Sequence, residues 1–241
     1  MKKKGIIIGI IIILVVLIMA GIIMVVSRNL GQEAALRVEM QEIYEMLGDT
    51  QVFEEEKVNE LSSRLEKTVT AGDYAVVEQT IKQYLKECVD YTAGIMDMIN
   101  SGKIEQLVTA NNYESDGPDF VESTKYISET RAKLEEAKTK FTDMLSEEKV
   151  KSYIEGKVDN QHYIDLYNKL ALGTGEENTL KEDTQSINES LDILINILNN
   201  EEKIINMLKE NKNHWKIEGD TILFDTDELV QEYNNLINEL Q

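Results

Sequence analysis

Side chains that could bind a divalent cation gather in one short stretch near the middle of the chain. Asn112, Glu114, Asp116 and Gly117 match the first, third, fifth and sixth positions of a calcium loop. Ser123 stands at the twelfth position, where such a loop needs a bidentate glutamate. Turn formation and helix capping explain the same residues without a metal. Asn112, Glu114 and Asp116 are therefore a candidate loop only, and we expect no metal or cofactor.

Residues that commonly carry out catalysis are sparse. The two histidines, His162 and His214, lie far apart, so no His-Glu-x-x-His zinc helix exists and both are expected at a surface. The chain also contains no Gly-x-x-x-x-Gly-Lys phosphate loop and no Gly-x-Ser-x-Gly elbow. Paired carboxylates carry no signal among 45 acidic residues. These patterns predict that the protein is not an enzyme.

Cys88 is the only cysteine, so no intramolecular disulfide can form. Between Asp73 and Ile99 it shares a helical spacing with Val77, Ile81 and other apolar residues. We therefore expect a buried, unreactive thiol.

The formal net charge of −20 excludes one class of partner. Nucleic acid binding needs clustered lysine and arginine, so we expect no nucleic acid partner. Solvation is the simplest reason for so many acids, and the alternative is binding of divalent or polycationic partners.

The first 26 residues predict a retained membrane anchor. Gly5 to Val26 carries no charged side chain, and about 20 apolar residues suffice to span a bilayer. The run is longer than that of a cleavable signal, and no small-residue cleavage site follows it. The side chains expected to contact membrane lipid include Ile6, Ile7, Ile8, Leu14, Val15, Val16, Leu17, Ile22 and Val26.

Charge next to this segment predicts its orientation. Lys2, Lys3 and Lys4 form a basic tail, residues 1–4, which the positive-inside rule places in the cytoplasm. No second apolar run of spanning length follows, so residues 28–241 are expected together outside the cytoplasm, with a possible subdivision near 111–119. The expected location is the cell membrane, with a single pass.

The exported part is expected to be mainly α-helical, because apolar residues recur at helical spacing and the chain has one proline. The first apolar stripe marks a helix that ends at Gly48, and the second marks a helix that ends near Gly72. Asp73 is the expected N-cap of a third helix. The first two stripes comprise Leu36, Met40, Ile43 and Leu47, and then Val58, Leu61, Leu65 and Val69.

Asn111 to Asp119 is rich in turn formers and is the main break in the middle of the chain, with Pro118 expected at the first position of a new helix. That helix repeats large and small residues every seven positions, a pattern that favours close helix packing. The two rows are Phe120, Ile127, Leu134 and Phe141, and Ser123, Thr130, Ala137 and Met144.

Ser146 is expected to begin a short helix, and a loop from Gly173 to Asn178 leads into the most apolar exported helix. A wide apolar stripe favours a central helix in a bundle with intramolecular layers over an extended coiled coil. Its stripe comprises Ile187, Leu191, Leu194, Leu198, Ile205 and Leu208, widened by Ile193, Ile195, Ile197 and Ile204.

The C-terminal part predicts a small β-hairpin followed by a final helix. Trp215, Ile217, Ile222 and Phe224 flank the segment from Glu218 to Thr221, and the alternation has a period of two. Asp225 or Thr226 is the expected cap of the helix after it. An isolated hairpin is marginal in water, so it must pack against the helices.

The segment from Thr221 to Leu240 resembles the end of uncharacterised bacterial cell-envelope proteins that are anchored by a lipid or an N-terminal helix. In both, an apolar strand with a phenylalanine, here Phe224, precedes a helix with Glu-Tyr-Asn-x-Leu, here Glu232 to Leu236. The lipidated cysteine of the lipoprotein members is absent. The resemblance implies an envelope location and a helical fold, and it carries over no catalytic residue.

Two functions remain open. The first is a non-catalytic structural or protein-interaction role in the bacterial envelope, with an envelope protein or a wall component as partner and the oligomeric state undetermined. The alternative is a sensor or carrier domain that binds a small ligand or divalent cation between helices. A pocket lined by converging polar side chains distinguishes the second from the first.

Overall fold

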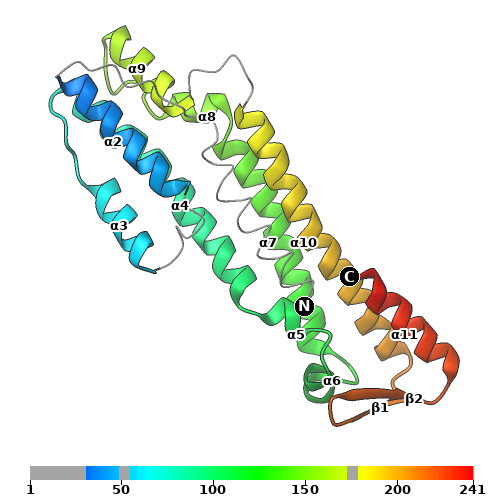
Figure 1. Cartoon of the computed structure of the whole chain (residues 1–241). Coiled ribbons are helices and arrows are strands. Elements are labelled where there is room, and N and C mark those ends of the chain that lie inside the picture. Colours follow the sequence, from blue (N-terminus) through cyan, green and yellow to red (C-terminus); the bar gives the residue numbers. More distant parts are fainter. Residues whose placement is uncertain (1–30, 49–54, 173–178, 241) are drawn as a thin grey trace. The chain divides into compact units, whose positions relative to one another are not determined.

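The computed structural model describes residues 31–48, 55–172 and 179–240, and it is mainly helical (Figure 1). The helices are α2 (Gln32–Leu47), α3 (Glu55–Glu66), α4 (Asp73–Asn100), α5 (Lys103–Gln106), α6 (Ala110–Asp116), α7 (Val121–Met144), α8 (Glu147–Ser152), α9 (Gln161–Leu172), α10 (Thr179–Glu210) and α11 (Asp227–Glu239). The strands β1 (Trp215–Glu218) and β2 (Thr221–Phe224) pair antiparallel. A mainly helical fold with a small hairpin near the C-terminus is confirmed.

The predicted membrane segment, residues 5–26, and the basic tail, residues 1–4, lie outside the described residues. Within the described ranges, no helix has both the length and the apolar character needed to cross a bilayer.

The chain divides into two compact units. The helical unit comprises residues 31–94 and 139–188, and the hairpin unit comprises residues 95–138 and 189–240, within the described parts. The divisions fall inside α4, α7 and α10. The stretch 111–119 therefore lies within the hairpin unit.

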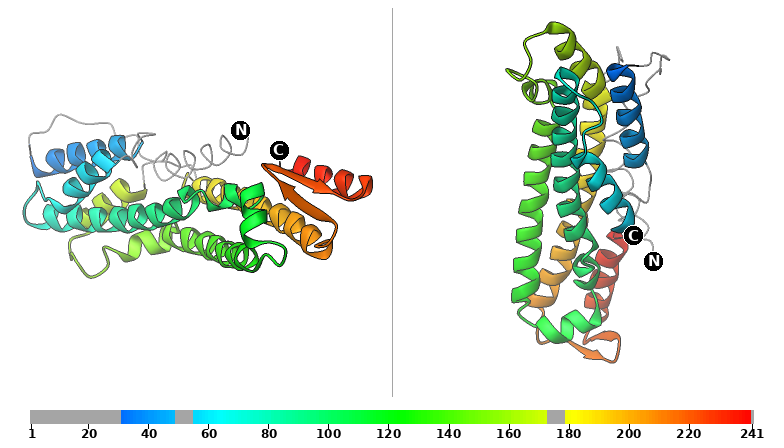
Figure 2. Two further views of the ribbon diagram at one scale, coloured as in Figure 1. Left: turned by 90° about the horizontal axis from the view of Figure 1, so that it is seen from below. Right: turned by 90° about the vertical axis from the view of Figure 1, so that its left-hand side faces the viewer.

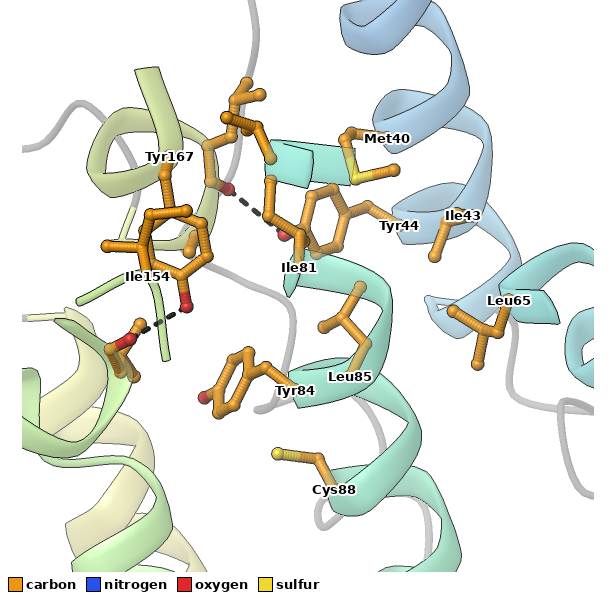
Figure 3. Close-up of a cluster of buried hydrophobic side chains, with 14 of the residues drawn as sticks. Met40, Ile43, Tyr44, Leu65, Ile81, Tyr84, Leu85, Cys88, Ile154 and Tyr167 are labelled. Atoms are coloured by element: carbon orange, nitrogen blue, oxygen red, sulfur yellow. Dashed lines mark hydrogen bonds between the residues drawn. The ribbon is translucent and has the colours of Figure 1, made fainter. Parts of the chain in front are cut away.

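A continuous apolar core holds the helical unit together (Figure 3). It joins side chains from α2, α3, α4, α8 and α9, and it contains every member of the first predicted stripe. Two buried tyrosine hydroxyls find backbone acceptors in it: Tyr44 donates to the Leu170 carbonyl at 3.0 Å, and Tyr167 donates to the Val150 carbonyl at 2.8 Å. These bonds remove the cost of burying a hydroxyl without a partner.

Two helix boundaries in this unit differ from the prediction. α3 ends at Glu66, so Val69, predicted on its stripe, lies outside the helix and is 51% exposed. Asp73 is the first residue of α4 and not the residue before it. Gly72, with a φ of +63°, precedes the helix, and its carbonyl accepts the N–H groups of Ala75 and Val76. Glycine occupies this left-handed conformation at little steric cost.

The break predicted over Asn111 to Asp119 begins too early: α6 covers Asn111 to Asp116, and the turn before α7 begins only at Gly117. Thr109 caps α6 by accepting a hydrogen bond from the Asn112 N–H. Pro118 does not begin the next helix: α7 starts at Val121. The two seven-residue rows predicted on α7 are confirmed as buried, including the polar members Ser123 and Thr130.

α10 buries the stripe predicted for it, except that Ile193 is 45% exposed. Ser146 caps α8 by accepting from the Lys149 N–H, as predicted. The Gly173 to Asn178 loop lies outside the described residues.

The predicted hairpin is confirmed, and its register places Trp215 opposite Phe224 and Ile217 opposite Ile222. Gly219 in its two-residue turn has a φ of +61°, which suits the first central position of a type II′ turn. Thr226 caps α11 by accepting from the Leu229 N–H. The strands lie beside α6 and α11 in Figures 1 and 2, and β1 contacts α6 while β2 contacts α11.

Candidate functional site

The predicted calcium loop forms the junction between α6 and α7. The Asn112 side-chain amide donates to the Leu107 carbonyl at 2.9 Å and to the Ser123 hydroxyl at 3.0 Å. The Asp116 carboxylate accepts the N–H of Glu122 at 3.1 Å and of Ser123 at 2.7 Å. Asp116 thus caps α7, a role that acidic side chains commonly fill at helix N-termini. Glu114 is exposed.

The pKa of the Asp116 carboxyl agrees with its role as a helix cap. Burial by itself raises the pKa of the Asp116 carboxyl, but the hydrogen bonds from Ser123 and Glu122 outweigh it and hold that pKa below its ordinary value. In the part of the chain that the structure describes, no group of three or more His, Cys, Asp or Glu side chains is placed to hold a metal ion.

Aromatic rings from three separate segments meet at the same junction. The Tyr113 ring centroid lies 5.9 Å from that of Phe120 and 6.4 Å from those of both Trp215 and Tyr233. The hydroxyls of Tyr113 and Tyr233 are 3.1 Å apart, and Trp215 donates its indole N–H to the Leu208 carbonyl at 2.8 Å. We call these four rings the aromatic cluster. It joins α6, the start of α7, the hairpin and α11.

Gly117 and Phe120 let the chain pass close to these rings. A Cβ at Gly117 would lie 2.4 Å from the Tyr113 carbonyl oxygen and 2.9 Å from Trp215, so no larger residue fits without displacement. The peptide bond from Gly117 to Pro118 is cis, and Phe120 has a φ of +48°. That left-handed conformation costs a non-glycine residue about 1–2 kcal/mol, and full burial of the Phe120 ring offsets it.

A hollow of about 390 Å³ opens beside the aromatic cluster. Its walls come from the start of α6, the hairpin and α11. The polar lining includes Asn111, Tyr113, Asp220 and Tyr233, and the apolar lining is Val108, Ala110 and Ile222. We call it the tyrosine hollow. Burial raises the pKa of both tyrosines, so their hydroxyls stay neutral and hydrogen-bonding at physiological pH.

A second hollow of about 330 Å³ lies between α5 and the start of α7. It is lined by Asn112, Ser123 and Tyr126 together with charged residues of both signs. The Lys103 ammonium lies 5.7 Å from the centre of the Tyr126 ring, a cation–π contact. Because its charges balance, this hollow indicates no ligand class.

The helical unit contains an ion cluster in which Glu39, Glu78 and Lys82 are buried and Arg64 is half-buried. Lys82 is 2% exposed, and its ammonium lies 2.7 Å from a carboxylate oxygen of Glu39 and 2.7 Å from one of Glu78. It also donates to the backbone carbonyls of Arg64 and Lys67. Arg64 binds the other side of Glu39 at 3.0 Å.

The second carboxylate of this cluster holds a connecting segment in place. Glu78 is fully buried and accepts the N–H groups of Val69 at 3.0 Å and Thr70 at 2.9 Å, and also the Thr70 hydroxyl at 2.6 Å. Burial raises the pKa of Glu78, but the hydrogen bonds from Lys82, Thr70 and Val69 outweigh it and hold the pKa below its ordinary value. The cluster therefore fixes the connection from α3 to α4.

Cys88 and the histidines lie where the sequence predicts. Cys88 is buried, and burial raises the pKa of its thiol to about 12, so it is not a thiolate at neutral pH. His162 is exposed and lies 3.7 Å from Glu33, while exposed His214 lies 3.3 Å from Asp225. The two histidines belong to different units.

The ion cluster and the tyrosine hollow are absent from the sequence predictions. Glu78 and Lys82 are spaced by four beside the buried Val77 and Ile81, which is a usable signal for an ion pair on a helix. Tyr113 and Tyr233 are separated by 120 positions, and no local pattern joins them.

Comparison with known proteins adds no assignment: no family model matches the chain, and neither curated proteins nor solved structures give a match.

Proposed function

We propose that this chain is a membrane-anchored protein of the bacterial envelope whose helical part lies outside the cytoplasm and serves a non-catalytic structural or protein-interaction role. The apolar segment from Gly5 to Val26 behind three lysines carries the placement. The resemblance of residues 221–240 to anchored envelope proteins supports it.

One structural observation supports the non-catalytic role. Three polar side chains are engaged with their own unit: Glu78 and Lys82 hold a backbone segment, and Asp116 caps a helix. Because their hydrogen bonds are already made within the protein, these side chains contribute to the fold and have few donors or acceptors left for a substrate.

The placement is tested with protease on intact cells that express the full chain with a C-terminal epitope. We expect the epitope to be lost after protease addition and the protein to stay in the membrane fraction after alkaline carbonate washing. Replacing Leu14 and Val16 with lysine should release the chain from the membrane, since charges in a bilayer centre are costly. The matched replacement of both with alanine should not. Protection of the epitope in intact cells contradicts the placement.

The second candidate function, a sensor or carrier domain, is favoured by the tyrosine hollow, whose volume of about 390 Å³ falls within the range of small-ligand sites. Calcium is the first ligand to test there and at the α6–α7 junction. We expect the melting temperature to stay unchanged in millimolar calcium, because the Asp116 carboxylate already binds backbone N–H groups. A rise that the D116N variant abolishes supports the divalent-cation alternative.

A further inference from the structure

We infer that the tyrosine hollow binds the ammonium group of a primary alkylamine. This inference rests on the second candidate function, ligand binding at the tyrosine hollow, and a partner lysine as the ligand would join it to the interaction role; it does not require the membrane anchor. The anchor is tested by protease and the hollow by titration, so the two can fail separately.

The charge of the hollow selects a cation. Asp220 is the one charged residue in its lining, and within the described chain this carboxylate takes part in no ion pair and no hydrogen bond. Lys216, the basic residue nearest in sequence on the hairpin, is paired with Glu218 at 2.6 Å. An anionic ligand would therefore face an unbalanced negative charge, and the net charge of −20 adds a long-range attraction for cations.

The balance of donors and acceptors selects an ammonium among cations. The acceptors are Asp220, the Asn111 amide oxygen and the lone pairs of the two tyrosine hydroxyls, and they outnumber the donors, which are the Asn111 NH2 group and the tyrosine O–H groups. One hydroxyl proton is used between Tyr113 and Tyr233. The Thr109 hydroxyl is also occupied, because it donates to the Gln106 carbonyl and accepts the Asn112 N–H. An ammonium offers three donors and no acceptor, so it matches a lining dominated by acceptors.

The remaining lining suits an alkyl chain. Val108, Ala110 and Ile222 supply apolar surface beside the tyrosine rings. A volume of about 390 Å³ lies at the low end of the usual range for ligand sites, which fits one short chain better than a large ligand. An ammonium can also contact a tyrosine ring through a cation–π interaction. The Lys149 ammonium does so elsewhere in the protein, 5.4 Å from the centre of the Tyr153 ring.

Such an amine has two sources: a free polyamine, or a lysine side chain of a partner protein. The same acceptors recognise both, because the two share an ammonium on an alkyl chain. The probes below distinguish them.

Trp215 makes the test direct, because it is the only tryptophan and its ring is 6.4 Å from that of Tyr113. The full-length chain in a non-ionic detergent is titrated with n-butylammonium at constant ionic strength while Trp215 fluorescence is recorded. We expect a saturable change. The neutral analogue 1-butanol should give none, since it cannot pair with Asp220.

Variants locate the site. Asp220 is exposed on the hairpin turn, so D220N should weaken butylammonium binding by about three- to fivefold, the upper range for an exposed ion pair. E232Q removes the same charge from an exposed side chain on α11 that does not line the hollow, and it should change the affinity less than about twofold. A110L fills the hollow without changing a charge and should also abolish binding, which keeps the test valid if D220N perturbs the hairpin.

Two further probes identify the source. Tighter binding of Nα-acetyl-lysine methylamide than of 1,5-diaminopentane indicates a partner lysine, and the reverse order indicates a free polyamine. Both results support the site. A response to 1-butanol equal to that of butylammonium, equal effects of D220N and E232Q, or no saturable response overturns it.

Discussion

The two units attach short segments to long helices by opposite means. In the helical unit the connection from α3 to α4 is held by the charges of Glu78 and Lys82. In the hairpin unit the connection from α6 to α7 is held by the rings of the aromatic cluster, and its cap Asp116 is only partly buried.

This difference has an energetic consequence. A buried charge depends on each of its partners, because the loss of one leaves the others desolvated and unpaired. Packed aromatic rings stabilise a fold through the apolar area that they bury and the fit of their shapes. The loss of one hydroxyl therefore costs little stability, whereas an added atom that does not fit costs more. We therefore expect the helical unit to be sensitive to the loss of charge and the hairpin unit to be sensitive to added volume.

The largest effect is expected for Lys82→Met. The variant leaves Glu39 and Glu78 buried without their shared cation, which should lower the free energy of unfolding by about 3–5 kcal/mol. Urea unfolding followed by circular dichroism measures it. Lys86→Met is the matched control, because Lys86 lies one turn later on α4 with an exposed ammonium, and it should stay within about 0.5 kcal/mol of the parent. Equal effects of the two variants contradict a structural role for the ion cluster.

Gly117→Ala should have the next largest effect, a loss of about 1–3 kcal/mol from overpacking against Tyr113 and Trp215. The fluorescence of Trp215 should change with it. Gly94→Ala makes the same substitution inside α4, where nothing lies within 4 Å of the added carbon. It should stabilise the protein by up to about 1 kcal/mol, because alanine favours helices. If Gly117→Ala and Gly94→Ala change the free energy of unfolding in the same direction, the packing around Gly117 is not the cause of the loss.

A smaller effect is expected from the hydroxyl pair. A double-mutant cycle with Tyr113→Phe and Tyr233→Phe should give a coupling of about 0.5–1.5 kcal/mol, the net value of one hydrogen bond. Pairing Tyr113→Phe with Tyr163→Phe, from the helical unit, serves as the control and should give a coupling near zero. A coupling near zero in the first cycle means that the two hydroxyls do not bond in solution.

The smallest effect on stability is expected from a change of pH near neutrality. The folded-state pKa of Glu78 lies below its ordinary value of 4.5, so its contribution is complete above that value and is lost as the pH falls through the folded-state pKa. Urea midpoints should thus be flat near neutrality and fall below about pH 4.5. Glu78→Gln should flatten this acid dependence, and Asp116→Asn should do the same in the hairpin unit. An unchanged acid limb in Glu78→Gln rules out Glu78 as a source of the dependence.

Local patterns predicted most helices because each depends on residues within a turn or two. The seven-residue rows of α7 and the stripe of α10 needed only periodicity. Thr226 and Ser146 needed only the residue type and its position before a helix. The same local reasoning failed at α6, where turn-forming residues are helical because Thr109 caps them and the Tyr113 ring is buried against Phe120 and Trp215.

The sequence by itself determined the helical class, the presence of the hairpin and the burial of Cys88, since periodicity and turn chemistry are short-range properties. Only the tertiary structure decided which charges are buried and where a hollow opens. Glu39 and Lys82 lie 43 positions apart, and Tyr113 and Tyr233 lie 120 apart. The fold brings such residues together by packing several helices at once, and no single segment of the chain carries that information.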